Sequence, residues 1–470
     1  MILSLGNPVI SFTSRCIRDY LASKRVCRYL LSDRDSDRFL DELVHKRQFH
    51  SVVKFCIRQF VKLDRLDMVH VLLERLLAAE PKRWIKVHRQ AEAFSRGRLN
   101  EQREVLAWLR ETDFNHDLLK LVAGQFPSIL ELSYTECPQE TIRDFVCLAK
   151  RATGEVSIQG VVVYMDGMFV SSALGLDLAR ALRGVTSLTT LVVCVRCVVD
   201  TGFVVDFLCD LFDGNSHVKN LTLEGPFNSA ENLTQAQHRR VRRVFAGGTP
   251  VGLQSLCLEH VNYHHRLAYL LSCWPDIFHK LEVRKSNLDS SGAKLLEKLS
   301  QCRHLSTLVL EHCHVLASTL EVVLQQLSAL RERLVLRTLC LNLLSSARHF
   351  TRSDARKPGF KPSLSLACCR FLAQFVAGSP TLTELTLCHD AIDDVKLRVL
   401  AEATSRSASL TSLDLTGNVI GDEACEDVVA FLINDRKLSI LYLHENSFSA
   451  DVRKALINGA VGKDSLRLSL

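Results

Sequence analysis

The stretch LTSLDLTGNVIGDEACEDVVAFL, from Leu410 to Leu432, decides the fold. Its apolar residues and Asn418 follow one another at steps of three, two, three and two residues up to Ile420. These steps fit neither an amphipathic helix nor a plain alternating strand. The central Leu-x-Leu predicts a short strand with both leucines turned inward. Beyond Ile420 the apolar residues recur at helical spacing, and Asp422 is suited to cap that helix. The stretch therefore predicts one unit of strand, turn and helix.

The same spacing recurs from about residue 126 to the end of the sequence. Copies start 28 residues before and 28 residues after Leu410, at Leu382 and Leu438. Earlier copies follow at intervals of 25 to 46 residues and start at Ile158, Leu188, Val218, Leu253, Phe278, Leu305 and Leu336. A weaker opening strand is predicted within 129–137. Because one such unit cannot bury both of its faces alone, the repetition predicts stacked units with parallel strands on one side and helices on the other.

The pattern L-x-x-L-x-L-x-x-N-x-L resembles the leucine-rich repeat of the ribonuclease-inhibitor type, which also occurs in NOD-like receptors, F-box receptors and bacterial effectors. The resemblance covers about residues 126–470 and implies an α/β fold, a horseshoe-shaped solenoid of parallel strands with outer helices. A small polar residue or a cysteine follows each strand, where its side chain can bond backbone groups of the turning loop. These residues are Asn418, Asn446, Asp390, Cys313 and Ser286.

Three parts of the chain differ in their residue patterns. Residues 1–14 are predicted to be a flexible N-terminus. Residues 15–125 show helical periodicity with few glycines, which predicts an all-α region that caps the solenoid or recruits other proteins. Residues 126–470 are the predicted leucine-rich repeat domain. The insert near 345–365 carries five Lys and Arg residues, two prolines and a glycine, which predicts an exposed basic loop.

Composition narrows the class of protein. No run of 18 apolar residues is present, so no membrane span is expected. The first residues lack the charge order of a secretory signal. The 17 cysteines are odd in number and many lie inside apolar runs, which predicts reduced core residues and a location in the cytoplasm or the nucleus. The net charge of +7 lies within residues 1–120, which hold 23 basic and 16 acidic residues (23 − 16 = 7), either as a binding patch or as a solvated surface.

No enzyme motif is present. The phosphate-binding, metalloprotease and serine-hydrolase patterns G-x-x-x-x-G-K-[ST], H-E-x-x-H and G-x-S-x-G are all missing. One Cys/His cluster could bind metal, although Cys313 already has a structural position in the repeat; its members are Cys302, His304, His312, Cys313 and His314. We therefore expect no catalytic residues, no cofactor and no metal.

The outward positions of the predicted strands form the candidate binding surface, because the curved face of a solenoid is commonly used for binding. The same side chains are equally compatible with a merely solvated face. The candidates are Glu224, Glu259, Glu282, Arg284, Glu311, His312, His389, Asp414, Tyr442, His444 and Glu445. We expect the last four at the centre of recognition, because the final repeats are the most regular and tyrosine is over-represented among interface hot spots.

The leading hypothesis is a non-enzymatic module that binds a partner protein on the concave face. Nucleic acid is not expected as a partner, because no aromatic platform accompanies the basic clusters at 239–243 and 348–361. One alternative is the substrate-recognition component of a ubiquitin ligase, of F-box-like or bacterial effector type. Ile17, Leu21 and the segment 26–30 resemble part of an F-box, with a shorter stretch between them. A second alternative is a Ran-type GTPase activator, which shares this repeat but has an acidic C-terminal tail that is missing here.

Overall fold

The computed structural model describes most of the chain in short consecutive stretches. These are residues 15–32, 36–79, 96–124, 126–133, 135–152, 154–165, 173–195, 201–213, 217–225, 234–246, 252–260, 279–288, 304–315, 317–343, 364–424, 437–460 and 466–470. Two compact units are present. The N-terminal unit comprises Met1–Tyr164 and Ser171–Thr189, and the C-terminal unit comprises Met165–Val170 and Thr190–Leu470.

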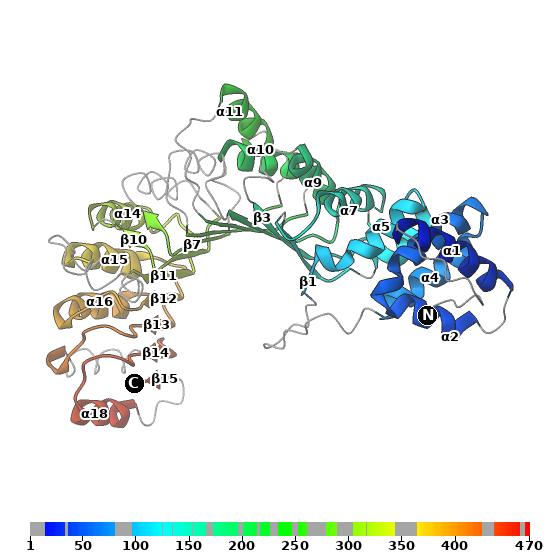
Figure 1. Cartoon of the computed structure of the whole chain (residues 1–470). Helices are drawn as coiled ribbons and strands as arrows, with labels where there is room; N and C mark the ends of the chain where they lie inside the picture. Colours follow the sequence, from blue (N-terminus) through cyan, green and yellow to red (C-terminus); the bar gives the residue numbers. More distant parts are fainter. Residues whose placement is uncertain are drawn as a thin grey trace. The chain divides into compact units, whose positions relative to one another are not determined.

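The N-terminal unit is mainly helical (Figure 1). Its helices are α1 (Arg15–Ser32), α2 (Ser36–His45), α3 (His50–Lys62), α4 (Leu66–Ala79), α5 (Arg103–Glu111), α6 (His116–Ala123), α7 (Gln139–Arg151) and α9 (Ala173–Arg183), with the 3-10 turns η1 (Arg47–Phe49) and η3 (Leu99–Gln102). Its parallel strands are β1 (Arg96–Arg98), β2 (Ile129–Ser133) and β3 (Gly160–Met165). The all-α prediction for 15–125 thus overlooked β1, which is only three residues long and has no alternating apolar pattern.

Packing in the N-terminal unit follows the chain, with α1 on α3, α3 on α5, α5 on α7 and α7 on α9. Trp108 and Phe60 are fully buried in this core. Helix α1 buries Asp19, which is 4% exposed, together with Cys27 and Leu30, while Ile17 is 55% exposed. The buried carboxylate accepts a hydrogen bond of 2.6 Å from Ser51 Oγ, and this bond offsets its lost hydration.

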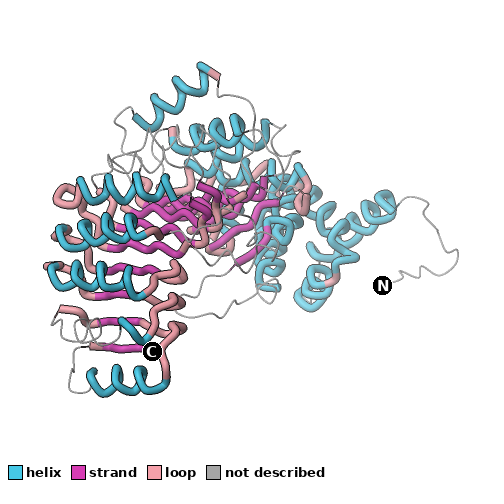
Figure 2. Tube along the Cα trace, turned by 90° about the vertical axis from the view of Figure 1, so that its left-hand side faces the viewer, coloured by secondary structure: helices cyan, strands magenta, loops and turns pink. Residues whose placement is uncertain are grey.

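The C-terminal unit stacks its strands side by side, with helices along one side (Figures 1 and 2). Its sheet contains β4 (Thr190–Val195), β5 (Asn220–Glu224), β6 (Ser255–Glu259), β7 (Lys280–Arg284), β9 (Thr307–Glu311), β11 (Thr338–Asn342), β12 (Glu384–Leu387), β13 (Ser412–Asp414), β14 (Ile440–Tyr442) and β15 (Arg467–Ser469), all parallel. The short strands β8 (Asn287–Leu288) and β10 (His314–Val315) form a separate pair. The predicted repeat strands and the α/β solenoid are confirmed.

The helices and turns of this unit follow the strands. They are α10 (Thr201–Phe212), α11 (Gln235–Val241), the π-helical turn η4 (Arg242–Ala246), α14 (Ala317–Ala329), α15 (Leu366–Gly378), α16 (Asp394–Arg406), the 3-10 turn η7 (Asp422–Ala424) and α18 (Ala450–Ala460). The helix predicted after Asp422 lies outside the described residues from 425 to 436. Asp422 Oδ1 accepts a bond of 2.9 Å from the amide of Ser449 in the next repeat.

The inward leucines hold the strands in one register. Leu385, Leu413 and Leu441 are direct neighbours on β12, β13 and β14, and each is at most 1% exposed. Removing a buried leucine side chain from water stabilises a fold by about 1.5 to 3 kcal/mol. Since each strand supplies such residues at the same two positions, a shift of one residue would turn them to the opposite face.

The asparagines after β13 and β14 bond the turning backbone, as predicted. Asn418 Oδ1 accepts bonds from the amides of Asp390 and Ile392, at 3.0 and 3.1 Å. Its Nδ2 donates to the carbonyls of Leu387 and Leu415, at 2.7 and 2.8 Å. The side chain therefore satisfies four backbone groups of two adjacent repeats, which would otherwise be buried without partners.

The other predicted turn residues act in the same place. Asn446 Nδ2 donates to the carbonyls of Leu415 and Leu443, at 2.9 and 2.8 Å. Cys313 Sγ lies 3.1 Å from the carbonyl oxygen of Val283, and burial raises the pKa of its thiol to about 12. Cysteine here is a buried hydrogen-bond donor, because its proton stays on sulfur at neutral pH.

A second ladder runs through the backbone itself. The residue two positions beyond the last inward apolar residue of a strand has a positive φ, between 48° and 114°, in seven repeats; these are Gly225, His260, Lys285, His312, His389, Gly417 and Glu445. The amides of the first six donate to a carbonyl oxygen of the following repeat at 2.6 to 3.1 Å. The left-handed conformation turns the chain out of the strand direction and joins neighbouring repeats.

Several predictions fall on residues that the structure does not describe. The N-terminus 1–14 and residues 345–363 of the basic insert lie outside the described residues. The last residue of the insert, Ser365, is not a loop residue: its side chain caps α15 by accepting a 3.1 Å bond from the amide of Cys368.

Most of the cysteines lie in the described part of the chain. Thirteen cysteines lie in the described residues and all are free, and only Cys16 and Cys147 among them are exposed. None of the described helices combines the length and the apolarity that a membrane span requires.

Asp390 replaces asparagine in one repeat, and its carboxyl is fully buried. Its Oδ1 accepts a 2.9 Å bond from the amide of Leu343, while its Oδ2 has no partner among the described residues. Burial raises the pKa of Asp390 well above its usual value. The folded state therefore binds this proton more tightly than the unfolded state. Protonation of Asp390 therefore stabilises the fold. This contribution is complete below pH 3.8, the pKa of the group in the unfolded chain, and it is lost as the pH rises through the pKa of the folded state.

We expect Asp390→Asn to increase the free energy of unfolding, and to do so more at pH 7 than at pH 4. An asparagine side chain at position 390 can make the same kind of backbone hydrogen bonds that Asn418 makes in its own repeat, and it needs no bound proton to be neutral. Urea unfolding at the two pH values measures the difference. Asn446→Asp is the matched control and should destabilise the fold more at pH 7. An equal effect of Asp390→Asn at both pH values would show that the carboxyl is not held neutral.

Gly417 provides the second test, because it has φ of 70° and the His389 ring lies against it. A Cβ built on Gly417 would lie 2.1 Å from two atoms of that ring. We expect Gly417→Ala to lower the free energy of unfolding by about 1 to 3 kcal/mol, from backbone strain and this clash together. His389→Ala in the same chain removes the clash, so it should restore that part of the lost free energy of unfolding. The part lost to backbone strain should remain. Gly124→Ala is the control, since the nearest atom to its Cβ is 3.8 Å away and the expected change is within about 0.5 kcal/mol.

Candidate functional site

The strand face of the C-terminal unit carries the predicted binding residues. We use this name for the outward residues of the strands and the two residues after each strand. Thr386, Asp414 and Tyr442 are direct neighbours on β12, β13 and β14, at or next to the end of each strand. All three are partly exposed, between inward leucines that are buried. Because paired strands lie about 4.8 Å apart, this register places the three residues side by side along the face.

Asp414, Tyr442 and His444 come together with Thr416, and we call these four residues the C-terminal cluster. Thr416 connects them: its amide donates to Asp414 Oδ1 at 3.0 Å, its hydroxyl donates to the same oxygen, and Oγ1 lies 3.3 Å from His444 Nε2. The Tyr442 ring meets the His444 ring edge-on, with 6.0 Å between the centroids and an angle of 81°. The carboxylate and both rings are thus held in defined positions.

The cluster offers a partner both polar and apolar groups. His444 Nδ1 is buried and has no hydrogen-bond partner among the described residues. Glu445, directly after the cluster, is exposed and has the left-handed conformation. His389 lies one repeat earlier, where its ring packs on Gly417. Of the four residues expected at the centre, the structure brings three together around Thr416 and leaves Glu445 at the edge.

No nucleophile is formed beside this cluster. Cys388 is the neighbouring thiol on the strand face, and burial together with the charge of Asp414 raises its pKa. Burial likewise raises the pKa of Cys257 and Cys340 to about 11 and about 12. These thiols stay protonated at neutral pH, whereas the thiolate is the reactive form.

The remaining candidates form a second group, the central cluster, on β5 to β9. Lys285 Nζ lies 2.7 Å from Glu259 Oε1, and Lys280 Nζ lies 2.7 Å from Glu282 Oε1. Arg284 Nε lies 3.2 Å from Glu311 Oε2. Each carboxylate of these pairs has a base beside it, so the cluster neutralises most of its own charge.

Further contacts complete the central cluster. Glu224 Oε2 accepts a bond of 3.1 Å from Cys194 Sγ. His312 Nε2 lies 3.6 Å from Glu311 Oε1. Burial alone would lower the pKa of Arg284, but the charges of Glu282 and Glu311 outweigh it and raise that pKa. The lysine and arginine side chains of this cluster are therefore paired with carboxylates of the same sheet.

Sequence reasoning missed three residues of these clusters. Thr416 and Cys388 occupy the seventh position of the repeat pattern, and Lys280 occupies the third. Thr416 and Cys388 are uncharged, and the ion pair of Lys280 depends on which strands are neighbours. A count of every outward side chain in the pattern could have found them.

No metal centre emerges from the described residues. They contain no group of three or more His, Cys, Asp or Glu that could hold an ion. In the predicted Cys/His cluster, Cys302 lies outside the described residues and Cys313 donates to the backbone of the preceding turn.

Comparisons with known proteins concern the repeat. The sequence profile of the family described as "Leucine Rich repeat" matches residues 406–429. No curated protein sequence matches the chain. A chain in the crystal structure of a TLR13–ssRNA13 complex is similar at 17% identity and a TM-score of 0.38, over 73% of this chain and 39% of that one. A protein from Bacteroides fragilis is similar at 13% identity and a TM-score of 0.28, over 67% of this chain and 65% of that one.

The matched segment includes β13 and the turn at Asn418. This is the repeat whose leucine spacing and turn hydrogen bonds recur along the C-terminal unit. The chain spans about two fifths of the length of the TLR13 chain and about two thirds of the Bacteroides protein. The repeated strands and this match show that the C-terminal unit contains leucine-rich repeats.

Proposed function

We propose that the chain is a non-enzymatic binding module, with repeats of the ribonuclease-inhibitor type, that binds a basic segment of a partner protein on its strand face. The C-terminal cluster is the centre of this interface. One observation carries the proposal: Asp414, Tyr442 and His444 stand on adjacent strands in fixed, partly exposed positions. A flat row of rigid side chains of this kind is suited to a protein surface rather than to an enclosed substrate.

The fixed positions favour affinity. Tyr442 provides a large contact area with few rotatable bonds, and tyrosine is frequent among hot spots. Thr416 holds the Asp414 carboxylate through two hydrogen bonds, so less side-chain entropy is lost when a partner binds.

Charge favours a basic partner segment. The strands β12 to β14 and the three residues after each carry the acidic residues Glu384, Asp414 and Glu445 on the strand face, and no Lys or Arg lies in these segments. Like charges repel across an interface, whereas complementary charges speed association and select partners. The same acidic groups disfavour the phosphate backbone of a nucleic acid.

Other charged regions support this choice by contrast. The central cluster pairs its acids and bases internally. The basic cluster at 239–243 is also partly neutralised, since Arg240 Nη1 lies 3.1 Å from Asp206 and Arg243 Nη2 lies 3.4 Å from Asp213. Such pairs offer a partner less net charge than the C-terminal cluster does.

The alternative roles both require a protein-binding face. A ubiquitin-ligase component or a Ran-type GTPase activator would use this surface with a specific partner, and no contact described here favours either one. The free cysteines among the described residues support a reducing compartment, the cytoplasm or the nucleus.

The test compares the partner proteins that bind to the intact chain with those that bind to a variant carrying two substitutions. Tyr442→Ala removes the ring, and Asp414→Asn removes the charge but keeps an oxygen for Thr416. We expect the double variant to weaken partner binding by at least about 2 kcal/mol, or about thirtyfold. Quantitative affinity purification identifies the partner, and calorimetry with the purified partner measures the change.

Arg239→Glu on α11 is the control, because Arg239 is exposed and lies on a helix. It should leave binding unchanged. Thermal unfolding should confirm that the variants of Tyr442 and Asp414 are folded. The proposal fails if the double variant binds as well as the parent while Arg239→Glu abolishes binding, since recognition would then lie on the helices.

A further inference from the structure

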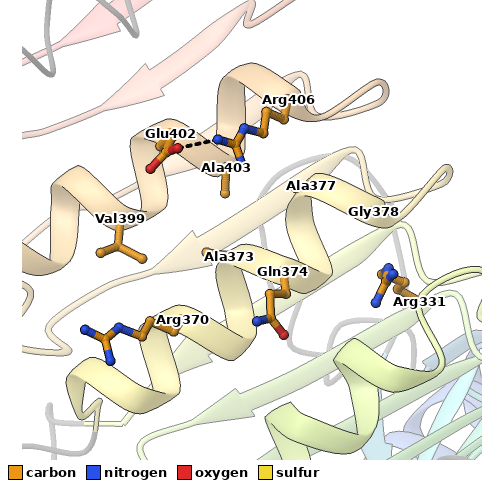
Figure 3. Close-up of a pocket in the computed structure, with 10 residues that line it drawn as sticks. All are labelled: Arg331, Arg370, Ala373, Gln374, Ala377, Gly378, Val399, Glu402, Ala403 and Arg406. Carbon is orange, nitrogen blue, oxygen red and sulfur yellow. Dashed lines mark hydrogen bonds and ion pairs between the residues drawn. The ribbon is translucent and has the colours of Figure 1, made fainter.

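A hollow lies on the helical side of the C-terminal unit, on helices α15 and α16 (Figure 3). Its volume is about 520 Å³, within the range of about 300 to 1,000 Å³ that is usual for small-molecule sites. Arg331, Arg370 and Arg406 stand around it. We call this hollow and its three arginines the arginine pocket.

Small residues create the hollow. Ala373, Ala377 and Gly378 of α15 and Ala403 of α16 line it, where larger side chains would fill the space between the helices. Gly378 also makes room for one arginine, because a Cβ there would lie 2.3 Å from Arg331 Cδ. Arg331 consequently lies across the end of α15, where its Nη1 donates to the carbonyl of Ser328 at 3.1 Å.

The polar groups of the pocket are mainly donors. Gln374 Oε1 already accepts a bond of 3.1 Å from Ser328 Oγ, so its amide nitrogen is the part left for a ligand. Arg406 pairs with Glu402, the one carboxylate of the lining. Arg370 has no ion pair and no hydrogen bond among the described residues. The three arginines and Glu402 leave a net charge of +2 (3 − 1 = 2).

This lining selects an anionic ligand with more than one charged group. The arginines stand at separate sides of the hollow rather than at one point, as Figure 3 shows, so one small anion cannot engage them all. Arginine binds phosphate through paired, charge-assisted hydrogen bonds. The lining contains no aromatic side chain on which a nucleotide base could stack.

We propose that the arginine pocket binds a small organic bisphosphate, with its phosphate groups on different arginines and its carbon body on the alanines. This site is on the helices, and it is independent of the strand face. A partner protein and the bisphosphate would therefore bind at different sites.

The experiment uses the full chain and fructose 1,6-bisphosphate as the probe. Calorimetry at constant ionic strength should show saturable binding, and glycerol 3-phosphate, with a single phosphate, should bind at least about tenfold more weakly. Arg370→Ala should weaken binding of the bisphosphate at least about tenfold, the scale of one lost charge-assisted bond. Arg370→Lys, which keeps the charge, should recover part of this loss.

Three further variants separate the pocket from general charge effects. Ala377→Leu fills the hollow without changing charge and should also weaken binding. Lys454→Ala removes one positive charge from α18, where Lys454 is exposed, and should have no effect. Tyr442→Ala should have no effect either, so that failure of the strand-face proposal and failure of this one are distinguishable.

Three results would overturn the proposal. The first is no saturable binding of the bisphosphate by the folded parent chain. The second is an equal loss of affinity in Arg370→Ala and Lys454→Ala, or no loss in Ala377→Leu, since the anion would then bind to scattered surface charges. The third is equally tight binding of a tetraglutamate peptide, which would indicate an acidic protein segment as the ligand.

Discussion

Every repeat depends on satisfying the backbone where the chain leaves a strand. Each parallel strand ends inside a stacked structure, and the amides and carbonyls of the following turn are out of reach of water. An unpaired buried group of this kind costs about 1 to 3 kcal/mol, and the cost recurs in each repeat. Asn418 and Asn446 each bond groups of two adjacent repeats, so one side chain closes a turn and joins two units at once. The leucines supply most of the stabilisation, but these bonds fix where each strand must end.

The left-handed residues extend the same principle to the backbone. An amide that points along the strand would miss the next repeat, and the positive φ turns it onto a carbonyl there. This has a consequence for the surface. His389 and Lys285 project where they do because the turn requires that conformation, so part of the strand face is arranged by the fold and only its residue types are free to vary.

The fold was largely predictable from spacing, and the site was predictable in outline only. The leucine steps at 410, 413 and 415 are local, and they identified the strands correctly. The pairing of Lys285 with Glu259 spans 26 residues and depends on which strands are neighbours. The link from Asp414 through Thr416 to His444 depends on rotamers and on the turn geometry. The strand β1 was missed because three residues carry no periodicity, and the arginine pocket was missed because its residues come from two helices, α15 and α16, and from the turn after α14.

The strands of the sheet pair regularly although the connections between them differ in length. Thr338 pairs with Glu384 across 46 residues, and Glu384 pairs with Ser412 across 28, yet both pairs belong to the same ladder. The register of two paired strands therefore does not depend on how many residues connect them. A unit of this kind can gain or lose a segment on its helical side in one genetic step, and the neighbouring repeats keep their places. In evolution, and in the hands of an engineer, the interval between β11 and α15 is a position at which new surface can be added to an unchanged frame.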